Sequence, residues 1–268
     1  MKDILQTIVA NKRIEVARQK EAVRLFSLLT MGVNRLERPT NSMRAALSTS
    51  DSGIIAEFKR KSPSKGWLHP DADVASVIPA YAQGGAAACS VLTDSYFFGG
   101  SLGDLQRARS FVPNLPLLRK DFIVDAYQLY QSRVMGADAI LLIASVLTLE
   151  ECRMLAETAH SLSLEVLLEV HTEEELGHLN EHIDMLGVNN RHLGTFHTDV
   201  ENSFRLAKQI QQATKAQGLL PLLVSESGLA EMETVCRLRD AGFRGFLIGE
   251  TFMKVADPGK ALNDFINS

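Results

Sequence analysis

Eight short apolar runs recur along this chain, and their alternation with helical patterns restricts its fold more than any other feature. The runs are residues 53–58, 88–92, 115–119, 138–143, 165–170, 185–189, 221–225 and 245–249. Short runs that are mostly apolar, without strict alternation of polar residues, are typical of parallel strands covered by helices on both faces. Eight such strands in a chain of 268 residues predict an α/β fold, a (β/α)8 TIM barrel. A doubly wound open sheet is the rival, but no G-x-G-x-x-G follows an early strand and no P-loop is present.

Helix signals lie between the apolar runs. Thr148 and Thr172 each stand three residues before a glutamate, which fits the capping box. Asp257-Pro258 fits an N-cap followed by proline at the first helical position. Glycines stand where three helices should end, at positions 84, 136 and 242. These signals predict the helical crossovers that a barrel requires.

The segment before the first apolar run has a different texture. Apolar residues at 4, 5, 8, 9, 14, 16 and 17 among charged ones predict an amphipathic helix over residues 3–29 that packs on another part of the molecule. We therefore expect residues 1–50 to form an N-terminal helical extension. We expect residues 1–268 as a whole to form a single barrel domain.

Charge and cysteine content exclude several classes of function. The formal net charge is −4, so no basic surface favours nucleic acid or an anionic membrane. Cys89, Cys152 and Cys236 are widely spaced and odd in number, which indicates free thiols in a reducing compartment. No apolar run is long enough for a signal peptide or a membrane span. These features predict a cytoplasmic protein.

Two histidines have the spacing of a metal pair. His178 and His182 are four residues apart in a segment expected to be helical, but no third ligand accompanies them. We interpret the pair as part of a surface helix. The sequence predicts no metal and no cofactor.

Polar and charged residues gather where the predicted strands end. They are Glu57 and Lys59, Arg119-Lys120-Asp121, Glu169, Asn189-Asn190-Arg191, Ser225-Glu226-Ser227-Gly228 and Gly249-Glu250-Thr251. A single charged pair such as Glu57 and Lys59 is also consistent with an internal ion pair. Six strands ending in this way point instead to an active site, because barrel enzymes build their sites at the carboxyl ends of the strands.

Two of these segments suggest an anion site. Ser227-Gly228-Leu229 and Gly249-Glu250-Thr251 follow the seventh and eighth strands. In this fold, the loops after those strands commonly bind phosphate through backbone N–H groups and a helix N-terminus. The sequence therefore predicts a phosphorylated small-molecule substrate.

The motifs at the strand ends resemble those of the indole-3-glycerol phosphate synthase family, and the resemblance covers nearly the whole chain. The matching segments are Glu57-Phe58-Lys59-Arg60-Lys61-Ser62-Pro63-Ser64-Lys65-Gly66, Ser90-Val91-Leu92-Thr93-Asp94, Phe97-Phe98-Gly99-Gly100-Ser101-Leu102, Leu118-Arg119-Lys120-Asp121-Phe122-Ile123, Leu168-Glu169-Val170-His171, Gly187-Val188-Asn189-Asn190-Arg191, Ser225-Glu226-Ser227-Gly228-Leu229 and Phe246-Leu247-Ile248-Gly249-Glu250. The resemblance implies a cofactor-free carboxy-lyase of tryptophan biosynthesis. Its reaction converts 1-(2-carboxyphenylamino)-1-deoxyribulose 5-phosphate into indole-3-glycerol phosphate, with loss of carbon dioxide and water.

The resemblance also implies roles for individual residues. Lys120 matches the acid for ring closure, with Lys59 as the alternative, and nearby cations are expected to lower the pKa of Lys120. Glu169 matches the acid–base group for dehydration, with Glu57 and Asn189 orienting the substrate. The remaining candidates bind the anionic ends of the substrate: Ser62, Arg191, Ser227, Gly228, Gly249 and Glu250.

Some features depart from the family pattern or leave alternatives open. His192 and Glu250 stand where other residues are common in the family, and the Glu250 carboxylate is expected to point away from the phosphate.

Two other functions are alternatives to this synthase. One is a phosphoribosylanthranilate isomerase, which would use a Cys and Asp pair, and the other is a non-catalytic barrel that binds a phosphorylated metabolite. The expected assembly state is a monomer or a weak homo-oligomer.

Overall fold

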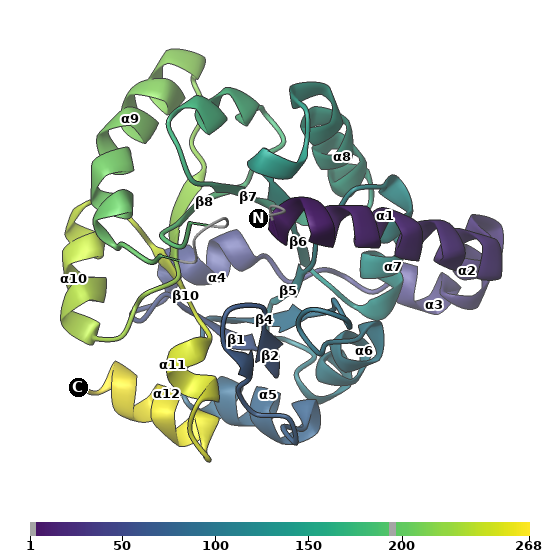
Figure 1. The fold of residues 1–268 in the computed structure, drawn as a ribbon, viewed down its shortest axis with the longest axis horizontal. Helices are drawn as coiled ribbons and strands as arrows, with labels where there is room; N and C mark the ends of the chain where they lie inside the picture. Colours follow the sequence, from purple (N-terminus) through teal and green to yellow (C-terminus); the bar gives the residue numbers. More distant parts are fainter. Residues whose placement is uncertain (1–3, 193–196) are drawn as a thin grey trace.

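Eight parallel strands close into a barrel, as the alternating pattern predicts (Figure 1). The structure is a computed structural model and describes residues 4–192 and 197–268. The barrel strands are β1 (Ile54–Phe58), β4 (Ala88–Leu92), β5 (Leu117–Lys120), β6 (Ala139–Ile143), β7 (Glu165–Val170), β8 (Met185–Asn189), β9 (Leu222–Glu226) and β10 (Gly245–Ile248). Each pairs with the next along the chain, and β1 pairs with β10 to close the barrel. The loop after β1 carries a small antiparallel pair, β2 (Lys61–Ser62) and β3 (Gly66–Trp67).

Helices surround the strands (Figure 1). They are α5 (Val74–Gln83), α6 (Leu102–Phe111), α7 (Ala126–Met135), α8 (Leu149–Ser161), α9 (Glu201–Gln217), α10 (Met232–Asp240), α11 (Glu250–Met253) and α12 (Pro258–Ile266), with the 3-10 helices η1 (Ala144–Val146) and η2 (Glu174–His178). The capping box at Thr148 and the cap at Asp257 are both formed. The predicted capping box at Thr172 is wrong. Only η2 follows β7, and the Glu175 carboxylate accepts the backbone N–H of His171 instead.

The N-terminal extension contains α1 (Ile4–Ala22), α2 (Leu25–Met31), α3 (Val33–Leu36) and α4 (Met43–Thr49). The single helix predicted over residues 3–29 is therefore wrong within the described part, because the helix is interrupted between α1 and α2. Arg24 is extended there, with φ −64° and ψ 149°. The Tyr127 hydroxyl, from α7, donates to the Val23 carbonyl at 2.7 Å and so satisfies an acceptor freed by the break.

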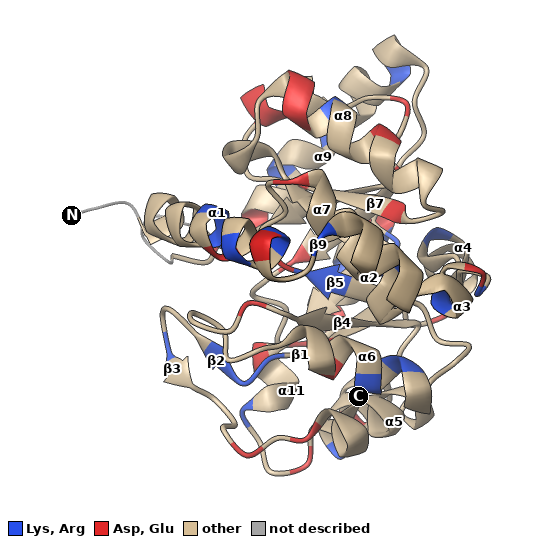
Figure 2. Ribbon diagram, turned by 90° about the vertical axis from the view of Figure 1, so that its right-hand side faces the viewer, with Lys and Arg blue, Asp and Glu red and all other residues tan. Residues whose placement is uncertain are grey.

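The extension covers both ends of the barrel. Helix α4 buries Met43 and Leu47 completely, in a core cluster with Ala88, Leu167 and Val224 from the strands. Helix α1 lies at the opposite end, on the same side as β2 and β3 (Figure 2). The extension thus closes one mouth of the barrel and supplies a wall to the other. Among the residues described, no helix has the length and apolar character needed to cross a membrane.

Candidate active site at the carboxyl ends of the strands

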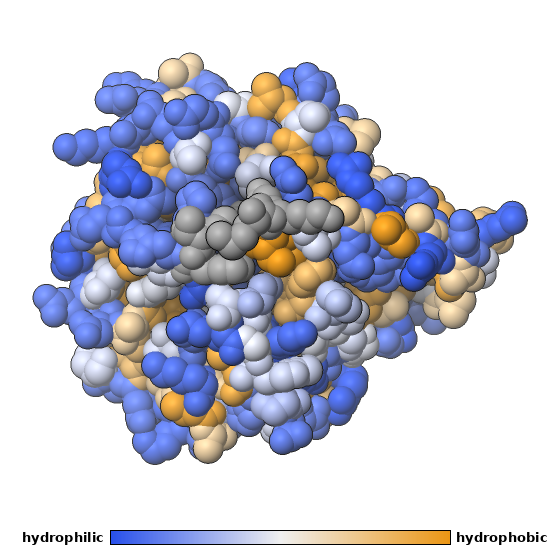
Figure 3. Space-filling view, viewed as in Figure 1, coloured by the Kyte–Doolittle hydropathy of each residue, from blue (hydrophilic) through white to orange (hydrophobic). Residues whose placement is uncertain are grey.

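A cavity of about 610 Å³ opens at the mouth that α1 partly covers. Ile4, Leu5 and Ile8 of α1 line one part of it. Apolar side chains are visible near the centre of this otherwise largely hydrophilic face (Figure 3). All eleven residues proposed from the sequence line the cavity: Glu57, Lys59, Ser62, Lys120, Glu169, Asn189, Arg191, Ser227, Gly228, Gly249 and Glu250. An apolar wall facing a polar floor suits a substrate that has both an aromatic and an anionic part.

Lys120, the last residue of β5, is held between two carboxylates. Its Nζ lies 3.0 Å from Glu169 Oε2 and 3.2 Å from Glu226 Oε2. Burial alone would lower the pKa of Lys120, but the charges of Glu169, Glu226 and Glu57 raise it above the ordinary value. The expected lowering of the pKa of Lys120 is therefore wrong, because the groups nearest to it are anions. The side chain remains protonated at neutral pH and is available as an acid.

Glu57 and Lys59 form an ion pair at the end of β1. Lys59 Nζ lies 2.5 Å from Glu57 Oε1. Burial opposes ionisation of Glu57, but the cations of Lys59, Lys120 and Arg191 lower the pKa of its carboxyl below the usual value. A side chain at Gly249 would collide with this carboxylate, because an added Cβ would stand 2.4 Å from Glu57 Oε1. Gly249 thus provides the space that Glu57 occupies.

Glu169 lies between Lys120 and a neighbouring amide. Its Oε1 accepts the Asn189 side-chain N–H at 3.1 Å, while its Oε2 accepts Lys120. Burial would raise the pKa of Glu169, but the charges of Lys120 and His171 lower it. The carboxylate is therefore ionised and can act as a base.

Glu226 lies beside Lys120 in the cavity, and although it stands among the polar strand-end residues, no role was expected for it from the sequence. Burial and the charge of Glu169 raise the pKa of Glu226 to about 7, against the opposing effect of Lys120. Among the described residues neither carboxyl oxygen accepts a hydrogen bond of good geometry, and the nearest cation is Lys120 Nζ, 3.2 Å from Oε2. The predicted seventh strand ended at Ser225, whereas β9 extends to Glu226, opposite Asn189 of β8. Strand alternation continued by one residue would have placed its side chain on the same face of the strand as Val224.

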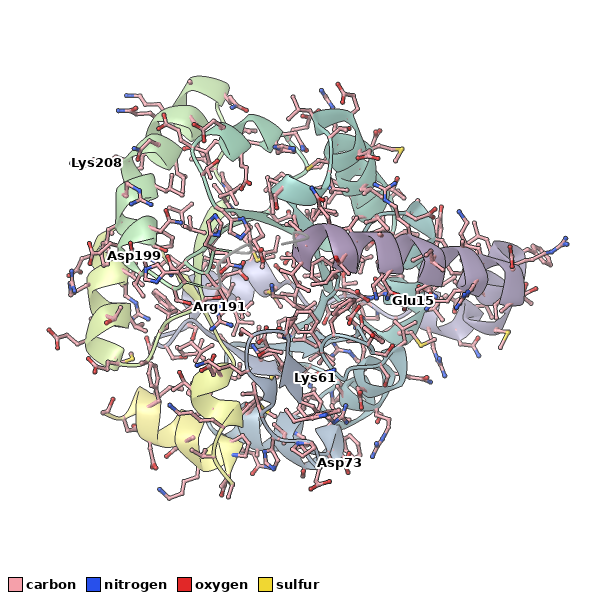
Figure 4. The ribbon with its side chains drawn as sticks, in the orientation of Figure 1. Glu15, Lys61, Asp73, Arg191, Asp199 and Lys208 are labelled. Atoms are coloured by element: carbon pink, nitrogen blue, oxygen red, sulfur yellow. The ribbon has the colours of Figure 1, made fainter. Side chains whose placement is uncertain are left out.

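Arg191 and Glu250 face each other across the cavity wall. Arg191 donates to the Glu250 carboxylate at 3.0 Å and to the Thr198 hydroxyl at 3.2 Å. Lys65 Nζ lies 4.0 Å from the other Glu250 oxygen. Arg191 lies toward the middle of the barrel mouth, whereas Lys208 lies on the outer face of α9 (Figure 4). The Glu250 carboxylate therefore lies against cations at the cavity wall, and its orientation away from a phosphate stays a prediction.

The loop after β9 has an unusual backbone. Ser227 and Gly228 both have positive φ, +70° and +80°. A Cβ at Gly228 would stand 2.6 Å from Thr198 Cγ2, so the loop packs closely against the segment that follows β8. Strained backbone of this kind is common where a chain presents N–H groups to a ligand.

A second residue that the sequence reasoning missed is Lys12 on α1. Its side chain is buried, and its Nζ lies 2.9 Å from Asp94 and 3.0 Å from Asp121. Ile8, Lys12 and Val16 are the buried residues of α1, at a spacing of four. A lysine within an apolar stripe is the signal that could have revealed it. Through these ion pairs, Lys12 links α1 to the loops that follow β4 and β5 beside the cavity.

The two histidines with metal-like spacing do not lie on a common helix. His178 is the last residue of η2, and its ring nitrogens lie 3.2 Å from the Glu175 carbonyl and 2.9 Å from the Leu147 carbonyl. His182 lies beyond η2, with its ring stacked edge to face on His160 at 5.2 Å. The predicted surface helix is wrong, because the short segment between β7 and β8 turns after one 3-10 helix.

Fold and site together define a (β/α)8 barrel whose ionisable side chains gather in a cavity at the carboxyl ends of the strands. A sequence model of the family described as indole-3-glycerol phosphate synthase matches residues 5–265. The indole-3-glycerol phosphate synthase of Bacteroides thetaiotaomicron is 56% identical over 268 residues, covering 100% of this chain and 99% of that protein. That of Polaromonas naphthalenivorans is 42% identical, covering 98% of each. The chain belongs to the indole-3-glycerol phosphate synthase family and is a carboxy-lyase of tryptophan biosynthesis.

Solved structures support the fold alone. A tryptophan synthase a2b2 complex structure from Pyrococcus furiosus matches with a TM-score of 0.59 and 12% identity, over 81% of this chain and 97% of that one. KGPDC from Streptococcus mutans matches with a TM-score of 0.60 and 12% identity, over 80% and 95%. At such low identity the likeness carries no argument about chemistry.

Proposed function

We propose that this cavity carries out the family's reaction on 1-(2-carboxyphenylamino)-1-deoxyribulose 5-phosphate with side chains alone. One observation carries the proposal: the carboxylates of Glu169 and Glu226 both lie within 3.2 Å of Lys120 Nζ. One cation between an ionised carboxylate and a carboxyl that titrates near neutrality supplies both an acid and a base.

Lys120 is the acid for ring closure. As the aromatic carbon attacks the ribulose carbonyl, negative charge develops on the carbonyl oxygen. An alkoxide is a stronger base than an amine, so a fully charged lysine can protonate it. The raised pKa of Lys120 keeps that proton in place until the alkoxide forms. Loss of carbon dioxide then leaves its electron pair in the ring and restores aromaticity.

Dehydration requires a second proton donor and a base. Glu169 removes a proton from the methylene carbon, and Lys120 or the carboxyl of Glu226 protonates the departing hydroxyl. Asn189 donates to Glu169 and so fixes the orientation of that carboxylate. Glu57 lies beside Lys59 and orients the anilino nitrogen and the sugar hydroxyls.

The anionic ends of the substrate bind at the rim. Ser227, Gly228 and Gly249 provide backbone N–H groups for the phosphate, with the N–H of Glu250 beside them. The carboxylate end binds a second group, which consists of Lys59, Ser62 and Arg191. The apolar wall of α1 accepts the aromatic ring.

The proposal predicts a direct assay. Incubation of the purified chain with the carboxyphenylamino substrate should produce indole fluorescence, and EDTA should not change the rate. Activity abolished by the chelator and restored by a divalent ion would contradict the mechanism. Turnover of phosphoribosylanthranilate in place of that substrate would favour the isomerase, and binding without turnover would favour a non-catalytic barrel.

Assembly and location belong to the same proposal. Helices α1 and α4 pack on the barrel through Ile8 and Leu47, which supports treating the chain as one domain. We expect a monomer or a weak homo-oligomer in the cytoplasm. Free cysteines support this location; burial raises the pKa of the Cys152 thiol to about 12 and makes it unreactive.

A further inference from the structure

His171 directly follows β7, and its ring lies between two carboxylates. Its Nε2 lies 3.5 Å from Glu169 Oε1, and its Nδ1 lies 3.5 Å from Glu175 Oε2. The Glu175 carboxylate is held in place by the backbone N–H of His171 at 2.5 Å. The three side chains form a continuous line from the catalytic carboxylate to η2.

This line leads from the interior towards solvent. The exposed fraction of the side chain rises from 2% at Glu169 to 11% at His171 and 16% at Glu175. Both ring nitrogens of His171 are buried, and neither has a hydrogen bond within the described residues. A buried donor without a partner costs roughly 1–3 kcal/mol, so this arrangement calls for an explanation. His171 is also absent from the described residues that line the cavity, so the ring acts from behind Glu169.

The proposed reaction requires a path by which a proton reaches the site from solvent. The carbonyl oxygen takes up two protons and leaves as water, while the methylene carbon gives up one. The carbon dioxide leaves without a proton, and its electron pair remains in the ring. One proton per turnover must therefore enter from solvent, and a substrate that fills the cavity covers Lys120 and Glu169 on the cavity side, because both line it.

We propose that Glu175, His171 and Glu169 relay this proton from solvent to Lys120. Glu175 delivers a proton to Nδ1 of the His171 ring, and the ring releases its Nε2 proton to Glu169 Oε1. Glu169 then returns a proton to Lys120 after the lysine has protonated the substrate. The inference rests on the proposed function, because it needs Lys120 as the acid. His171 is a positioning residue here, since it acts only through Glu169.

Geometry and charge both favour this transfer. Each 3.5 Å separation exceeds a hydrogen bond by roughly 0.5 Å, so a small movement of the ring is enough to bring one nitrogen at a time within hydrogen-bond distance of its carboxylate. Three carboxylates influence the ring, those of Glu175, Glu169 and Glu226. Burial lowers the pKa of His171, but these groups raise it above its usual value. The neighbouring carboxylates thus favour the charged form of the ring, which has a proton to release.

Rapid mixing of enzyme and substrate tests the relay. In His171→Gln the first turnover should keep the parent's rate within about twofold, because Lys120 begins protonated and Glu169 supplies the second proton from the methylene carbon. Later turnovers should slow roughly tenfold or more, which produces a burst. His182→Gln, in the same segment but outside the line, should behave as the parent. A variant that slows the first turnover as much as the later ones, or slows neither, would overturn the relay.

Titration of the His171 ring by NMR tests the coupling without turnover. The pKa of His171 should lie above its usual value in the parent and fall in Glu175→Gln, because one of the three carboxylates that raise it is replaced by a neutral amide. A ring that titrates normally and does not respond to Glu175→Gln would exclude the line of coupled groups. That result holds even if the chain makes no indole product, so it separates failure of the relay from failure of the proposed function.

Discussion

Replacement of Lys12 by methionine tests how the N-terminal extension is joined to the active site. Lys12 Nζ contacts Asp94 and Glu15 at 2.9 Å and Asp121 at 3.0 Å, and only 1% of its side chain is exposed. Methionine has a similar length and no charge. The substitution therefore removes the cation and leaves the surrounding packing largely unchanged.

The expected loss of stability follows from the contacts that the two aspartates keep after the substitution. Asp121 keeps its ion pair with Arg119 at 2.9 Å, whereas the one hydrogen bond that Asp94 keeps among the described side-chain contacts is from the backbone N–H of Phe97 at 2.8 Å. Breaking a buried ion pair on one side costs about 3–5 kcal/mol, because the remaining charge stays buried without a partner. In a protein of this size, that corresponds to a fall in Tm of roughly 10 °C.

Urea unfolding followed by circular dichroism measures the loss, and two further variants interpret it. Lys20→Met removes an exposed cation from the same helix, where the pair with Asp125 is 49% and 34% exposed, so a change below about 1 kcal/mol is expected. Lys12→Met combined with Asp94→Asn neutralises the stranded carboxylate and should recover about 2 kcal/mol.

The activity of Lys12→Met should also depend on how firmly α1 packs against the active site. Helix α1 also supplies Ile4, Leu5 and Ile8 to the cavity wall, so loosening it should raise KM more than it lowers kcat. A Lys12→Met protein whose free energy of unfolding stays within about 1 kcal/mol of the parent would refute the reasoning. The buried ion pairs of Lys12 would then contribute no net free energy to folding.

Three other predictions concern the site itself. Lys120→Ala should lower kcat by ~10² or more while substrate affinity stays comparable, and near-normal turnover would transfer the acid role to Lys59. If Glu226 donates a proton, kcat should fall as pH rises through about 7, since the carboxyl can donate only below its pKa; Glu226→Gln should lower kcat and abolish this limb of the pH profile. Gly228→Val should weaken binding of substrate and inorganic phosphate, whereas Gly218→Val, with φ +68° and no neighbour within 4 Å of an added Cβ, reports strain alone. Unchanged phosphate affinity in a folded Gly228→Val protein would place the phosphate site elsewhere.

The fold could be read from the sequence because its signals are local. Apolar runs separated by caps and glycines are enough to predict parallel strands and crossovers, and closure of the barrel confirms the prediction. The break after α1 could not be predicted in this way. No glycine or proline marks it, and it depends on a hydroxyl of Tyr127 more than a hundred residues away.

The sequence by itself determined which chemical groups stand at the strand ends, since strand alternation and the rule for barrel sites fix their location. Only the tertiary structure decided their charge states. The pKa of Lys120 depends on Glu169 and Glu226, which come from β7 and β9, so the expected lowering became a rise. Lys12 likewise acquires its role from Asp94 and Asp121 across the barrel mouth. Electrostatic effects depend on distance in space, and that distance exists only once the barrel has closed.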